Sequence, residues 1–284
     1  MNIMKNIKDF TVNNDDLKKM SITDFYKDQE IFITGGSGFI GKALIEKLLR
    51  SFPNFKKMYI LLRSKKDKTA DERLQELLDN SIFQRARDEQ PESFKKIHAI
   101  AGDCRELGLS ISSEHLVNDY KNKLPVLVYR VAMVVSSVDE PVPGWLDNLN
   151  GPFGLFLSAS LGLTRTALIS PHSKMNYIPC DATVHGLIIS AYAVVSDASF
   201  ANNSKDSVVV LNSCYSNENL IPLWKILRDG KKLAEENPSE NMVWLPDGRV
   251  TGSFPEYFIR FLFGQLALAI LLDVIVRLKT GKPL

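Results

Sequence analysis

The sequence has few cysteines and almost no net charge. Its three cysteines, at positions 104, 180 and 214, are odd in number, widely spaced and without a Cys-x-x-Cys pair. This usage is typical of reduced thiols in a cytosol-facing protein and argues against a disulfide framework or a cysteine-based zinc site. A net charge of +2 gives no reason to expect nucleic acid as a partner.

The sequence also lacks a secretion signal at its N-terminus. Lysines and aspartates recur through the first twenty residues, which contain no apolar stretch of signal-peptide length. Residues 1–25 are therefore expected to form a solvated tail.

Two further classes of catalytic site find no support in the sequence. The four histidines, at positions 98, 115, 172 and 185, lie far apart and not at the spacing of metal ligands. Neither the serine pair at 136–137 nor Ser213 lies in a Gly-x-Ser-x-Gly elbow, so a serine hydrolase is not supported.

The most informative segment is a glycine-rich turn between a strand-like run and a helix-like run. Residues 30–34 are mostly β-branched and aromatic, and an apolar periodicity of helical spacing begins near position 41. Gly35 would allow the tight turn, Gly38 would let the backbone approach a pyrophosphate, and Gly41 would let the helix pack closely. The free N–H groups at the positive end of the helix would then hold the phosphates. The segment predicts a dinucleotide site.

Two other readings of this turn remain open. Residues 36–42 fit the Gly-x-x-x-x-Gly-Lys spacing of a P-loop, but position 43 is alanine, where a P-loop has the Ser or Thr that binds Mg²⁺. The turn could also be rich in glycine without binding a ligand. The flanking strand and helix favour the dinucleotide reading.

Strand-like and helix-like segments alternate along the chain. This alternation predicts an α/β protein with a Rossmann-type, doubly wound parallel sheet. The expected nucleotide-binding domain spans residues 26–215, and residues 216–284 are expected to be a helical C-terminal region. The expected strands are 30–34, 58–62, 97–101, 126–135 and 208–212, and the expected helices are 41–51, 71–87, 183–195 and 219–236.

The residue after the second strand bears on the choice of cofactor. An acidic residue there binds the ribose 2′-hydroxyl of NAD, whereas an arginine accommodates the 2′-phosphate of NADP. This chain has Arg63, and no acidic residue follows it before Asp67. The charge therefore favours NADP(H) over NAD(H). The nearby lysines, at 65, 66 and 68, are expected to lie in a solvated loop.

Several motifs together resemble the extended short-chain dehydrogenases, and within them the alcohol-forming fatty acyl-CoA reductases of animals and plants. The glycine turn, Arg63 and Gly102-Asp103 match the wider group. The most specific piece of the closer match is residues 140–152, which read Glu-Pro-Val-Pro-Gly-Trp-Leu-Asp-Asn-Leu-Asn-Gly-Pro. The resemblance runs from about residue 21 to the end, and its other parts are 24–26, 42–50, 72–74, Phe83, 178–181 and the apolar C-terminal segment.

The resemblance implies an enzyme that binds NADPH on its Rossmann sheet and reduces a long-chain fatty acyl-CoA to a fatty alcohol with two hydrides. It also implies that Arg63 binds the 2′-phosphate, that Asp103 contacts the adenine and that Cys104 lies beside that contact. The cofactor-binding residues expected from the resemblance are Thr34, Gly35, Ser37, Gly38, Phe39, Ile40, Gly41, Arg63, Asp103 and Cys104.

The catalytic pair of that family is absent from this chain. In the family a Tyr lies four residues before a Lys, one helical turn apart, so that the Lys lowers the pKa of the Tyr that donates a proton. None of the eight tyrosines of this chain is followed by a Lys at that spacing. No catalytic residue is therefore assigned.

The short distance between two strand-like runs explains this absence. Only 22 residues separate Asp103 from Val126, too few for the family's strand, helix, strand and catalytic helix at roughly 30 residues per strand–helix–strand unit. The chain is therefore expected to be deleted between 103 and 126, and shortened at its C-terminus, relative to the family. It is either a true shortened product or an incomplete gene model. We hypothesise that residues 126–135 replace the missing strand beside residues 30–34.

The C-terminal region contains a nearly continuous apolar run, residues 261–276, which only Gln265 and Asp273 interrupt. Sixteen residues are fewer than the roughly 20 that a bilayer-spanning helix needs. A tilted span, an interfacial helix and a buried core helix therefore all remain open. A membrane-type segment at 258–278 is the favoured reading.

The favoured function is NADPH-dependent reduction of a long-chain fatty acyl-CoA, with little or no turnover by this chain because the proton donor is missing. The alternative is a non-catalytic NADP(H)-binding paralogue that regulates or pairs with an intact reductase, as a homodimer or heterodimer. A sugar-nucleotide-modifying enzyme is a third reading, against which residues 140–152 argue. The expected partner surface is membrane lipid, at the endoplasmic reticulum or peroxisome, with the nucleotide domain facing the cytosol.

Overall fold

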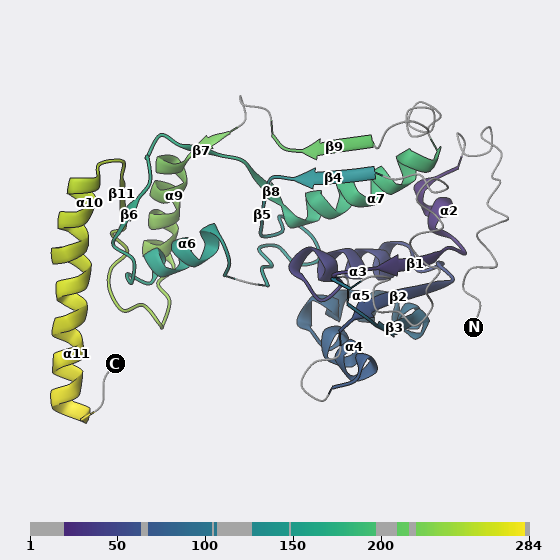
Figure 1. The fold of residues 1–284 in the computed structure, drawn as a ribbon, viewed down its shortest axis with the longest axis horizontal. Helices are drawn as coiled ribbons and strands as arrows, with labels where there is room; N and C mark the ends of the chain where they lie inside the picture. Colours follow the sequence, from purple (N-terminus) through teal and green to yellow (C-terminus); the bar gives the residue numbers. More distant parts are fainter. Residues whose placement is uncertain are drawn as a thin grey trace. The chain divides into compact units, whose positions relative to one another are not determined.

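The computed structural model describes residues 20–63, 68–103, 105–106, 127–147, 149–196, 209–215 and 220–281 (Figure 1). The chain divides into two compact units. Unit 1 consists of residues 1–147 and 178–214, and unit 2 consists of residues 148–177 and 215–284.

Unit 1 contains a parallel sheet of β1 (Glu30–Ile33), β2 (Lys57–Leu62) and β3 (Ile97–Ala101), in the order β1-β2-β3 (Figure 1). Glu30 pairs with Lys57, and Met58 pairs with Ile97. The last five residues of β2 are all buried, as expected for the central strand of a parallel sheet covered on both faces. Helix α3 (Phe39–Ser51) connects β1 to β2.

The segment predicted as one helix over 71–87 is broken in the structure. It consists of α4 (Ala70–Leu78), the 3₁₀ turn η2 (Ser81–Phe83) and α5 (Gln84–Glu89), followed by a second 3₁₀ turn, η3 (Pro91–Lys96). The break falls at Asn80, whose side chain accepts a hydrogen bond from the N–H of Ile82 and so begins a new turn. Asn is a residue that favours such local bonding over a continuous helix.

The described part of this run, residues 127–135, does not pair with β1, so our hypothesis that residues 126–135 replace the missing neighbour of that strand is wrong. They form β4 (Leu127–Val131) and β5 (Met133–Val135). β4 pairs in parallel with β9 (Val209–Ser213), and β5 pairs with β8 (Tyr177–Pro179). Among the described residues, β1 pairs with β2 alone, and Phe32 on it is 44% exposed.

β4 and β9 belong to one strand–helix–strand unit. Helix α7 (Cys180–Ser196) lies between the two strands in sequence and packs on β4, giving a parallel strand–helix–strand unit. The Tyr129 hydroxyl of β4 lies directly over Gly186 of α7, where a larger residue would clash with it. β4 is therefore covered by α7 on one face.

Helices α3 and α7 pack together and form the centre of the core of unit 1. The short helix α2 (Ile22–Tyr26) joins them, because the buried Tyr26 hydroxyl donates to the carbonyl oxygen of Ile188 at 3.0 Å. The expected solvated tail, residues 1–25, is therefore wrong in its last part, because a packed helix begins at Ile22. Large buried side chains of this core include Ile45, Leu49, Phe55, Met58, Ile60, Phe83 and Val184.

Unit 2 is built from two separate parts of the chain, because short strands from each part pair with one another. β6 (Thr166–Leu168) pairs with β11 (Arg249–Thr251), and β7 (Lys174–Met175) pairs with β10 (Ile221–Pro222). Helix α6 (Pro152–Ser160) packs on α9 (Leu223–Glu236). Residues 148–177 therefore belong with the C-terminal region, whereas the sequence had led us to place them in a nucleotide-binding domain of residues 26–215.

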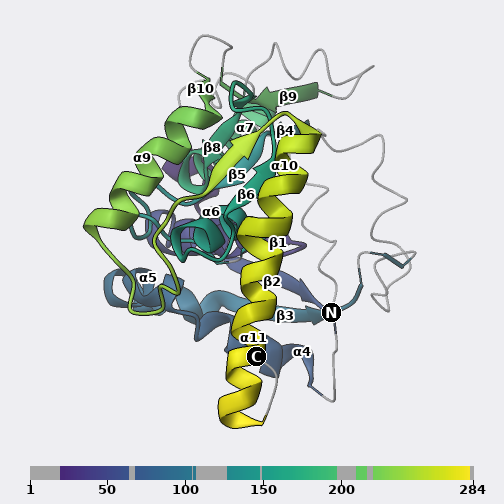
Figure 2. The same ribbon diagram turned by 90° about the vertical axis from the view of Figure 1, so that its left-hand side faces the viewer.

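The C-terminus is a long helix in three parts, drawn as one continuous rod in Figure 2. These parts are α10 (Phe254–Phe261), the π-helical turn η6 (Leu262–Leu266) and α11 (Ala267–Thr280). The stretch Phe254–Leu278 has 25 residues and contains an 18-residue window with a mean hydropathy of 2.1, so it is long and apolar enough to cross a membrane by length and composition. It is longer than the apolar run of 261–276 because the helix begins seven residues earlier.

Candidate functional site

The residues singled out in the sequence follow the carboxyl ends of three neighbouring parallel strands. Thr34 to Gly38 follow β1, Arg63 follows β2, and Gly102-Asp103 follow β3. The Gly102 N–H donates to the Leu62 carbonyl oxygen at 3.1 Å, which extends the pairing and keeps Asp103 beside Arg63. This edge of an open parallel sheet is where such folds bind ligands.

The glycine turn is a compact loop in which one glycine has a left-handed backbone conformation and two others leave no room for a side chain. Gly35 has φ of +69°, a left-handed conformation that favours glycine, and its carbonyl oxygen accepts from the Gly38 N–H at 3.0 Å. A methyl group at Gly41 would overlap the Gly35 carbonyl oxygen and lie 2.8 Å from Gly36 Cα. A methyl group at Gly36 would lie 2.7 Å from Ile60, so Gly36 is a packing residue that the sequence did not reveal.

The N-terminus of α3 opens onto this turn without a side-chain cap. Its N-cap residue is Gly38, and the first backbone bond of the helix runs from the Lys42 N–H to the Gly38 carbonyl oxygen at 2.9 Å. The N–H groups of the preceding turn, at 39–41, have no partner within the helix. Thr34, Gly35, Ser37 and Gly38 are exposed, and Phe39, Ile40 and Gly41 are half-buried. The turn can therefore receive an anion.

Arg63 and Asp103 lie close together at the ends of β2 and β3. Arg63 Nη1 is 3.7 Å from Asp103 Oδ2, and the backbone carbonyl of Arg63 accepts a hydrogen bond from the Arg73 guanidinium. Asp103 also binds Arg105, whose Nη2 lies 2.9 Å from Asp103 Oδ2. Hydrogen bonds from Arg105 and the charge of Arg63 lower the pKa of Asp103 to about 2. Cys104 lies outside the described residues.

The loop that carries Trp145 is docked on the first half of α3. The Trp145 ring stacks on Phe39 with centroids 5.1 Å apart, and Lys42 Nζ lies 2.7 Å from Asp147 Oδ2. Trp145 is half-buried against the core, so it is a packed anchor of its loop. This contact brings the most specific part of the sequence resemblance next to the glycine turn.

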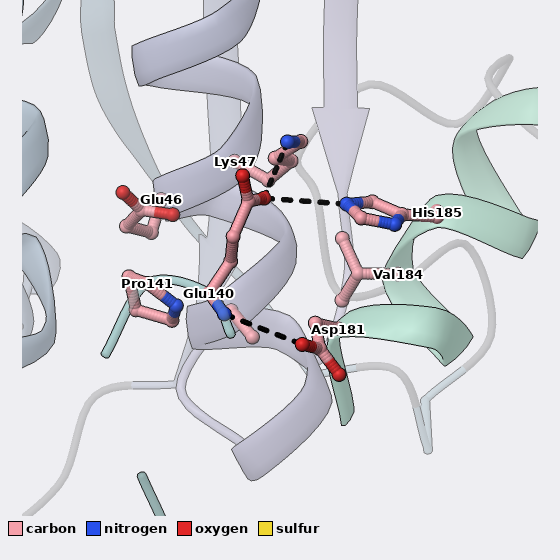
Figure 3. A pocket seen from close by; sticks show the side chains of 8 residues that line it. Glu46, Lys47, Glu140, Pro141, Asp181, Val184 and His185 are labelled. Carbon is pink, nitrogen blue, oxygen red and sulfur yellow. Dashed lines mark hydrogen bonds and ion pairs between the residues drawn. The ribbon is translucent and has the colours of Figure 1, made fainter. Parts of the chain in front are cut away.

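Glu140, at the start of the same loop, joins α3 to α7 through ion pairs with α3 and a contact with His185 of α7 (Figure 3). Its Oε2 lies 2.5 Å from Lys47 Nζ, 3.1 Å from Arg50 Nη2 and 3.3 Å from His185 Nε2. Burial alone would raise the pKa of Glu140, but the hydrogen bonds and charges of Lys47 and Arg50 outweigh it and lower the pKa to about 2. Arg50 also binds the buried Glu46 at 2.6 Å.

Asp181, near the start of α7, fixes the backbone of that loop from the other side (Figure 3). Its Oδ2 accepts from the N–H groups of Val138, Asp139 and Glu140 at 3.0, 2.8 and 3.2 Å. Burial opposes ionisation, but these backbone bonds prevail and lower the pKa of Asp181. A small pocket here is lined by Ala43, Glu46, Lys47, Glu140, Pro141, Asp181, Val184 and His185. Its charged groups bind one another, so we interpret it as a structural joint.

The tyrosines of unit 1 whose hydroxyls have assigned contacts serve structural roles. The Tyr26 hydroxyl bonds Ile188, and burial raises its pKa to about 12, the opposite of what a proton donor at neutral pH requires. The Tyr192 hydroxyl donates to the Met20 carbonyl oxygen at 2.7 Å, and Tyr129 packs on Gly186. Within the described ranges, no three His, Cys, Asp or Glu residues are placed to hold a metal ion.

Solved structures show the fold. The reductase domain of a nonribosomal peptide synthetase from Mycobacterium tuberculosis is 16% identical, with a TM-score of 0.56 over 88% of this chain and 80% of that chain. A second structure of this domain gives a TM-score of 0.52 at 15% identity, over 88% of this chain and 79% of that chain. The likeness supports the Rossmann-type α/β arrangement that the sequence predicted.

Relatives of known name extend over nearly all of the chain. The fatty acyl-CoA reductase wat of Drosophila melanogaster is 24% identical over 401 positions, covering 100% of this chain and 76% of the fly protein. Fatty acyl-CoA reductase 1 of Mus musculus is 24% identical over 381 positions, covering 93% of this chain and 73% of the mouse protein. Both aligned stretches are longer than the 284 residues of this chain, so both relatives contain residues inside them that this chain lacks.

A family model described as Male sterility protein matches the chain in two segments, residues 33–115 and 111–187. Together these segments cover more than half of the chain, and the first contains the glycine turn, Arg63 and Asp103. The chain therefore belongs to the male sterility protein family, whose model describes an NAD-binding domain.

Proposed function

We propose that this chain is a fatty acyl-CoA reductase-like protein that binds NADPH on unit 1 and does not complete the reduction of acyl-CoA. The observation that carries the proposal is the convergence of the glycine turn, Arg63 and Asp103 at one edge of the β1-β2-β3 sheet. The names of the relatives supply the reaction class, which is the reduction of a fatty acyl-CoA. The long-chain substrate and the fatty alcohol product are what the sequence resemblance implies.

The glycine turn would hold the pyrophosphate of the cofactor. The uncapped N–H groups at 39–41 and the positive end of the 13-residue helix α3 favour an anion there. Ser37 and Thr34 are exposed beside the turn and can donate hydroxyl hydrogen bonds. The nicotinamide ring, when bound, supplies the hydride.

The preference for NADPH over NADH rests on charge at the end of β2. The Arg63 side chain is 56% exposed, and a guanidinium can bind a phosphate through two parallel hydrogen bonds. No acidic residue follows Arg63 directly to bind a ribose 2′-hydroxyl.

The absence of turnover follows from the missing Tyr-x-x-x-Lys pair. Without the tyrosine hydroxyl, no group identified in this chain would protonate the carbonyl oxygen as hydride arrives. Two observations support an internal deletion as the cause: the relatives contain extra residues within the aligned stretch, and the family model matches in two segments that meet at 111–115. Sequencing the native transcript across the codons for 103–126 distinguishes a true short product from an incomplete gene model.

The alternative role is a non-catalytic NADP(H)-binding paralogue that pairs with an intact reductase or with a second copy. The edge of β1 favours it, because among the described residues that strand has a neighbour on one side only, and edge strands are templates for pairing between chains. This role predicts copurification with an active reductase.

Membrane lipid is the surface on which we propose that the protein acts. The stretch Phe254–Leu278 has the length and hydropathy of a spanning helix, and none of its most apolar part is buried in the structure. A long-chain acyl-CoA partitions into the same bilayer. We propose the endoplasmic reticulum or the peroxisome as the membrane, with unit 1 facing the cytosol.

The test uses the full-length chain in detergent micelles. We expect NADPH to bind, as measured by its fluorescence, and long-chain acyl-CoA to leave NADPH absorbance unchanged. The mouse fatty acyl-CoA reductase 1 serves as the active control. Sustained NADPH consumption would refute the proposed inactivity, and failure of both NADPH and NADH to bind would refute the nucleotide site itself.

A further inference from the structure

Three consecutive apolar side chains are exposed in the loop between α9 and β11 of unit 2. The exposed fractions are 57% for Val243, 48% for Trp244 and 71% for Leu245. Leu163, in the turn after α6, is 51% exposed. Single exposed apolar residues are ordinary on protein surfaces, whereas a run that includes a tryptophan indicates a surface that binds another apolar surface.

The backbone of this loop is fixed, so the exposure of its side chains is set by the fold. The N–H groups of Val243 and Trp244 both donate to the Leu161 carbonyl oxygen, at 3.0 and 3.3 Å. Gly162, with φ of +76°, leaves no room for a side chain because the Trp244 carbonyl group lies against it. Pro246, the residue after the exposed run, is buried. The loop therefore presents a built apolar edge.

The loop lies at the end of unit 2 from which the C-terminal helix leaves. Only two residues separate β11 from α10, and α10 packs on both β11 and β6. Because this connection is short, α10 runs back along the two strands, toward the loop that precedes β11. Figures 1 and 2 show the loop after α9 at the end of unit 2 beyond which α11 projects.

The charged residues of α10 indicate where a bilayer would begin. Glu256 accepts a hydrogen bond from the Thr251 hydroxyl of β11 at 2.7 Å and pairs with Arg260 at 2.8 Å. These groups hold α10 against the strands and are costly to place within hydrocarbon. The apolar run of 261–276 begins directly after Arg260. A bilayer that holds this run would have its surface near Phe261, at the end of α10 that lies toward the loop.

An arginine accompanies the tryptophan at this edge. Arg165 Cζ lies 5.6 Å from the centre of the Trp244 ring, which is the geometry of a cation–π contact. Tryptophan prefers the region between headgroups and acyl chains, where one end of its ring is apolar and the other is hydrated. An arginine beside it can bind headgroup phosphates while its aliphatic stem lies on the apolar side. The chemistry of the loop thus fits the surface of a phospholipid bilayer.

We propose that residues 242–245 insert into the headgroup region of the bilayer beside the entry point of the C-terminal helix, so that unit 2 rests on the membrane surface. Trp244 and Leu245 are the anchoring side chains, about 5–10 Å into the boundary between headgroups and acyl chains. This inference rests on the proposed membrane span and goes beyond it, because a span alone leaves the orientation of unit 2 on the bilayer free.

The test measures the depth of a single tryptophan in proteoliposomes of phosphatidylcholine that contain the full-length chain. Trp145→Phe with Trp224→Phe retains Trp244 alone. Its emission should fall when the lipid is replaced by phosphatidylcholine brominated near the carbonyl end of an acyl chain. The loss should be smaller with phosphatidylcholine brominated near the methyl end. Acrylamide in the water should quench this tryptophan weakly.

Trp224 provides a matched control. It is exposed to a similar extent, 42%, and Arg228 Cζ lies 5.2 Å from the centre of its ring. It is the second residue of α9, at the end of that helix opposite to the loop. The variant that retains Trp224 alone, Trp145→Phe with Trp244→Phe, should show no loss of emission with either brominated lipid and should be quenched strongly by acrylamide.

A second substitution tests the loop without removing its tryptophan. In the protein that retains Trp244 alone, Leu245→Asp should remove most of the quenching by brominated lipid, because an aspartate is costly to insert and keeps the loop in water. Leu245→Ile should retain the quenching. Leu245 is largely exposed, so both variants should keep the melting temperature of their parent.

The outcomes separate this inference from the proposed membrane span. If the chain stays with membranes after alkaline carbonate extraction but brominated lipid does not quench Trp244, the loop contact is overturned and the span is left intact. Equal quenching of Trp224 and Trp244 would overturn the proposed orientation. Protection of Trp244 from acrylamide without quenching by lipid would mean that a protein surface covers the loop, which also overturns the proposal. Release of the unaltered chain by carbonate would overturn the span and this inference with it.

Discussion

At Gly41 the carbonyl oxygen of Gly35 occupies the place of a side chain. We expect Gly41→Ala to destabilise unit 1 by about 1–3 kcal/mol, because the methyl group must displace backbone atoms of the turn. The same displacement should weaken NADPH binding. The measurement is thermal unfolding together with a cofactor titration.

The matched control for this substitution is Gly230→Ala in α9, where a methyl group meets nothing within 4 Å. There the change should stabilise the helix by about 0.5–1 kcal/mol, because alanine loses less backbone entropy than glycine. A Gly41→Ala protein as stable as the unaltered chain would show that the turn can relax and that close approach is not required.

The single residues differ in how much of their role could be predicted. Gly35, Gly38 and Gly41 lie in a pattern whose spacing reflects local backbone geometry, so their positions in the turn could be inferred from the sequence. Glycine is needed at position 36 because the Ile60 side chain of the neighbouring strand leaves no room for a larger residue. Asp181 is needed because three backbone N–H groups some forty residues earlier donate hydrogen bonds to its carboxylate. Contacts between distant parts of the chain leave no local pattern.

Among the elements, α3 and α7 are joined through Glu140, and this joint should fail in acid. The folded state holds the pKa of Glu140 at about 2, below its ordinary value of 4.5. A carboxylate with a lowered pKa stabilises the fold fully above its ordinary pKa, and that contribution is lost as the pH falls toward the folded value. We expect stability to decline between about pH 4.5 and pH 2 for this reason.

The comparison that isolates this effect is Glu140→Gln. We expect the variant to be about 1–2 kcal/mol less stable at pH 7, because Lys47 and Arg50 lose an ionised partner. It should then lose less stability than the unaltered chain on acidification, as measured by urea unfolding at pH 7, 4.5 and 3. The exposed pair of Arg85 and Glu89 gives a control, Glu89→Gln, that should change neither profile. Parallel acid profiles for Glu140→Gln and the unaltered chain would contradict this account.

The C-terminal helix is expected to hold the protein in the membrane. We expect the full-length chain to remain with membranes after alkaline carbonate extraction. The variant Ile270→Asp with Leu271→Asp should be released, because an aspartate costs about 2.5–3.5 kcal/mol near the centre of a span. Both residues are more than half exposed in the structure, so the substitutions should not disturb a packed core. Ile270→Leu with Leu271→Ile is the control and should stay in the membrane fraction.

Most elements of unit 1 could be located from the sequence, since periodicity and strand composition are local signals. β1, β2 and β3 lie within one residue of the expected ranges, and α7 lies within three. The predicted helix at 71–87 was wrong in its middle, where side-chain bonding at Asn80 ends one helical turn and begins another. The partner expected for residues 126–135 was also wrong, because β4 pairs with β9, which lies far along the chain, and such a distant pairing leaves no local pattern in the sequence.

For the whole molecule, the division into two units predicts that a bound cofactor stabilises unit 1 against unfolding more than unit 2. The glycine turn, Arg63 and Asp103 all belong to unit 1, so NADPH at 100 times its dissociation constant should stabilise unit 1 by about 2.7 kcal/mol. The three tryptophans can report this, because Trp145 lies in unit 1, whereas Trp224 and Trp244 lie in unit 2.

The measurement uses fluorescence-detected melting of two variants. Trp224→Phe with Trp244→Phe retains only Trp145 and should melt at a higher temperature when NADPH is present. Trp145→Phe retains the tryptophans of unit 2, and its transition should move less. Equal shifts in the two variants would show that the units unfold together.

The discontinuous composition of unit 2 could not be predicted, because the pairing of β6 with β11 and of β7 with β10 joins residues about fifty or more positions apart. Each of these strands has only two or three residues, too few to show a periodicity.

The edge of β1 has a consequence for handling the protein. The strand reads Glu-Ile-Phe-Ile, with its one charge at the first residue and no proline or lysine of the kind that blocks addition of strands. Within the described part of the chain nothing pairs with its outer side, and Phe32 is exposed there. Aggregation should therefore increase steeply with protein concentration, and precipitates formed on storage should be rich in intermolecular β-structure. Detergent for the C-terminal helix will not be enough in concentrated preparations. These will also require that the edge of β1 is blocked from pairing with another chain.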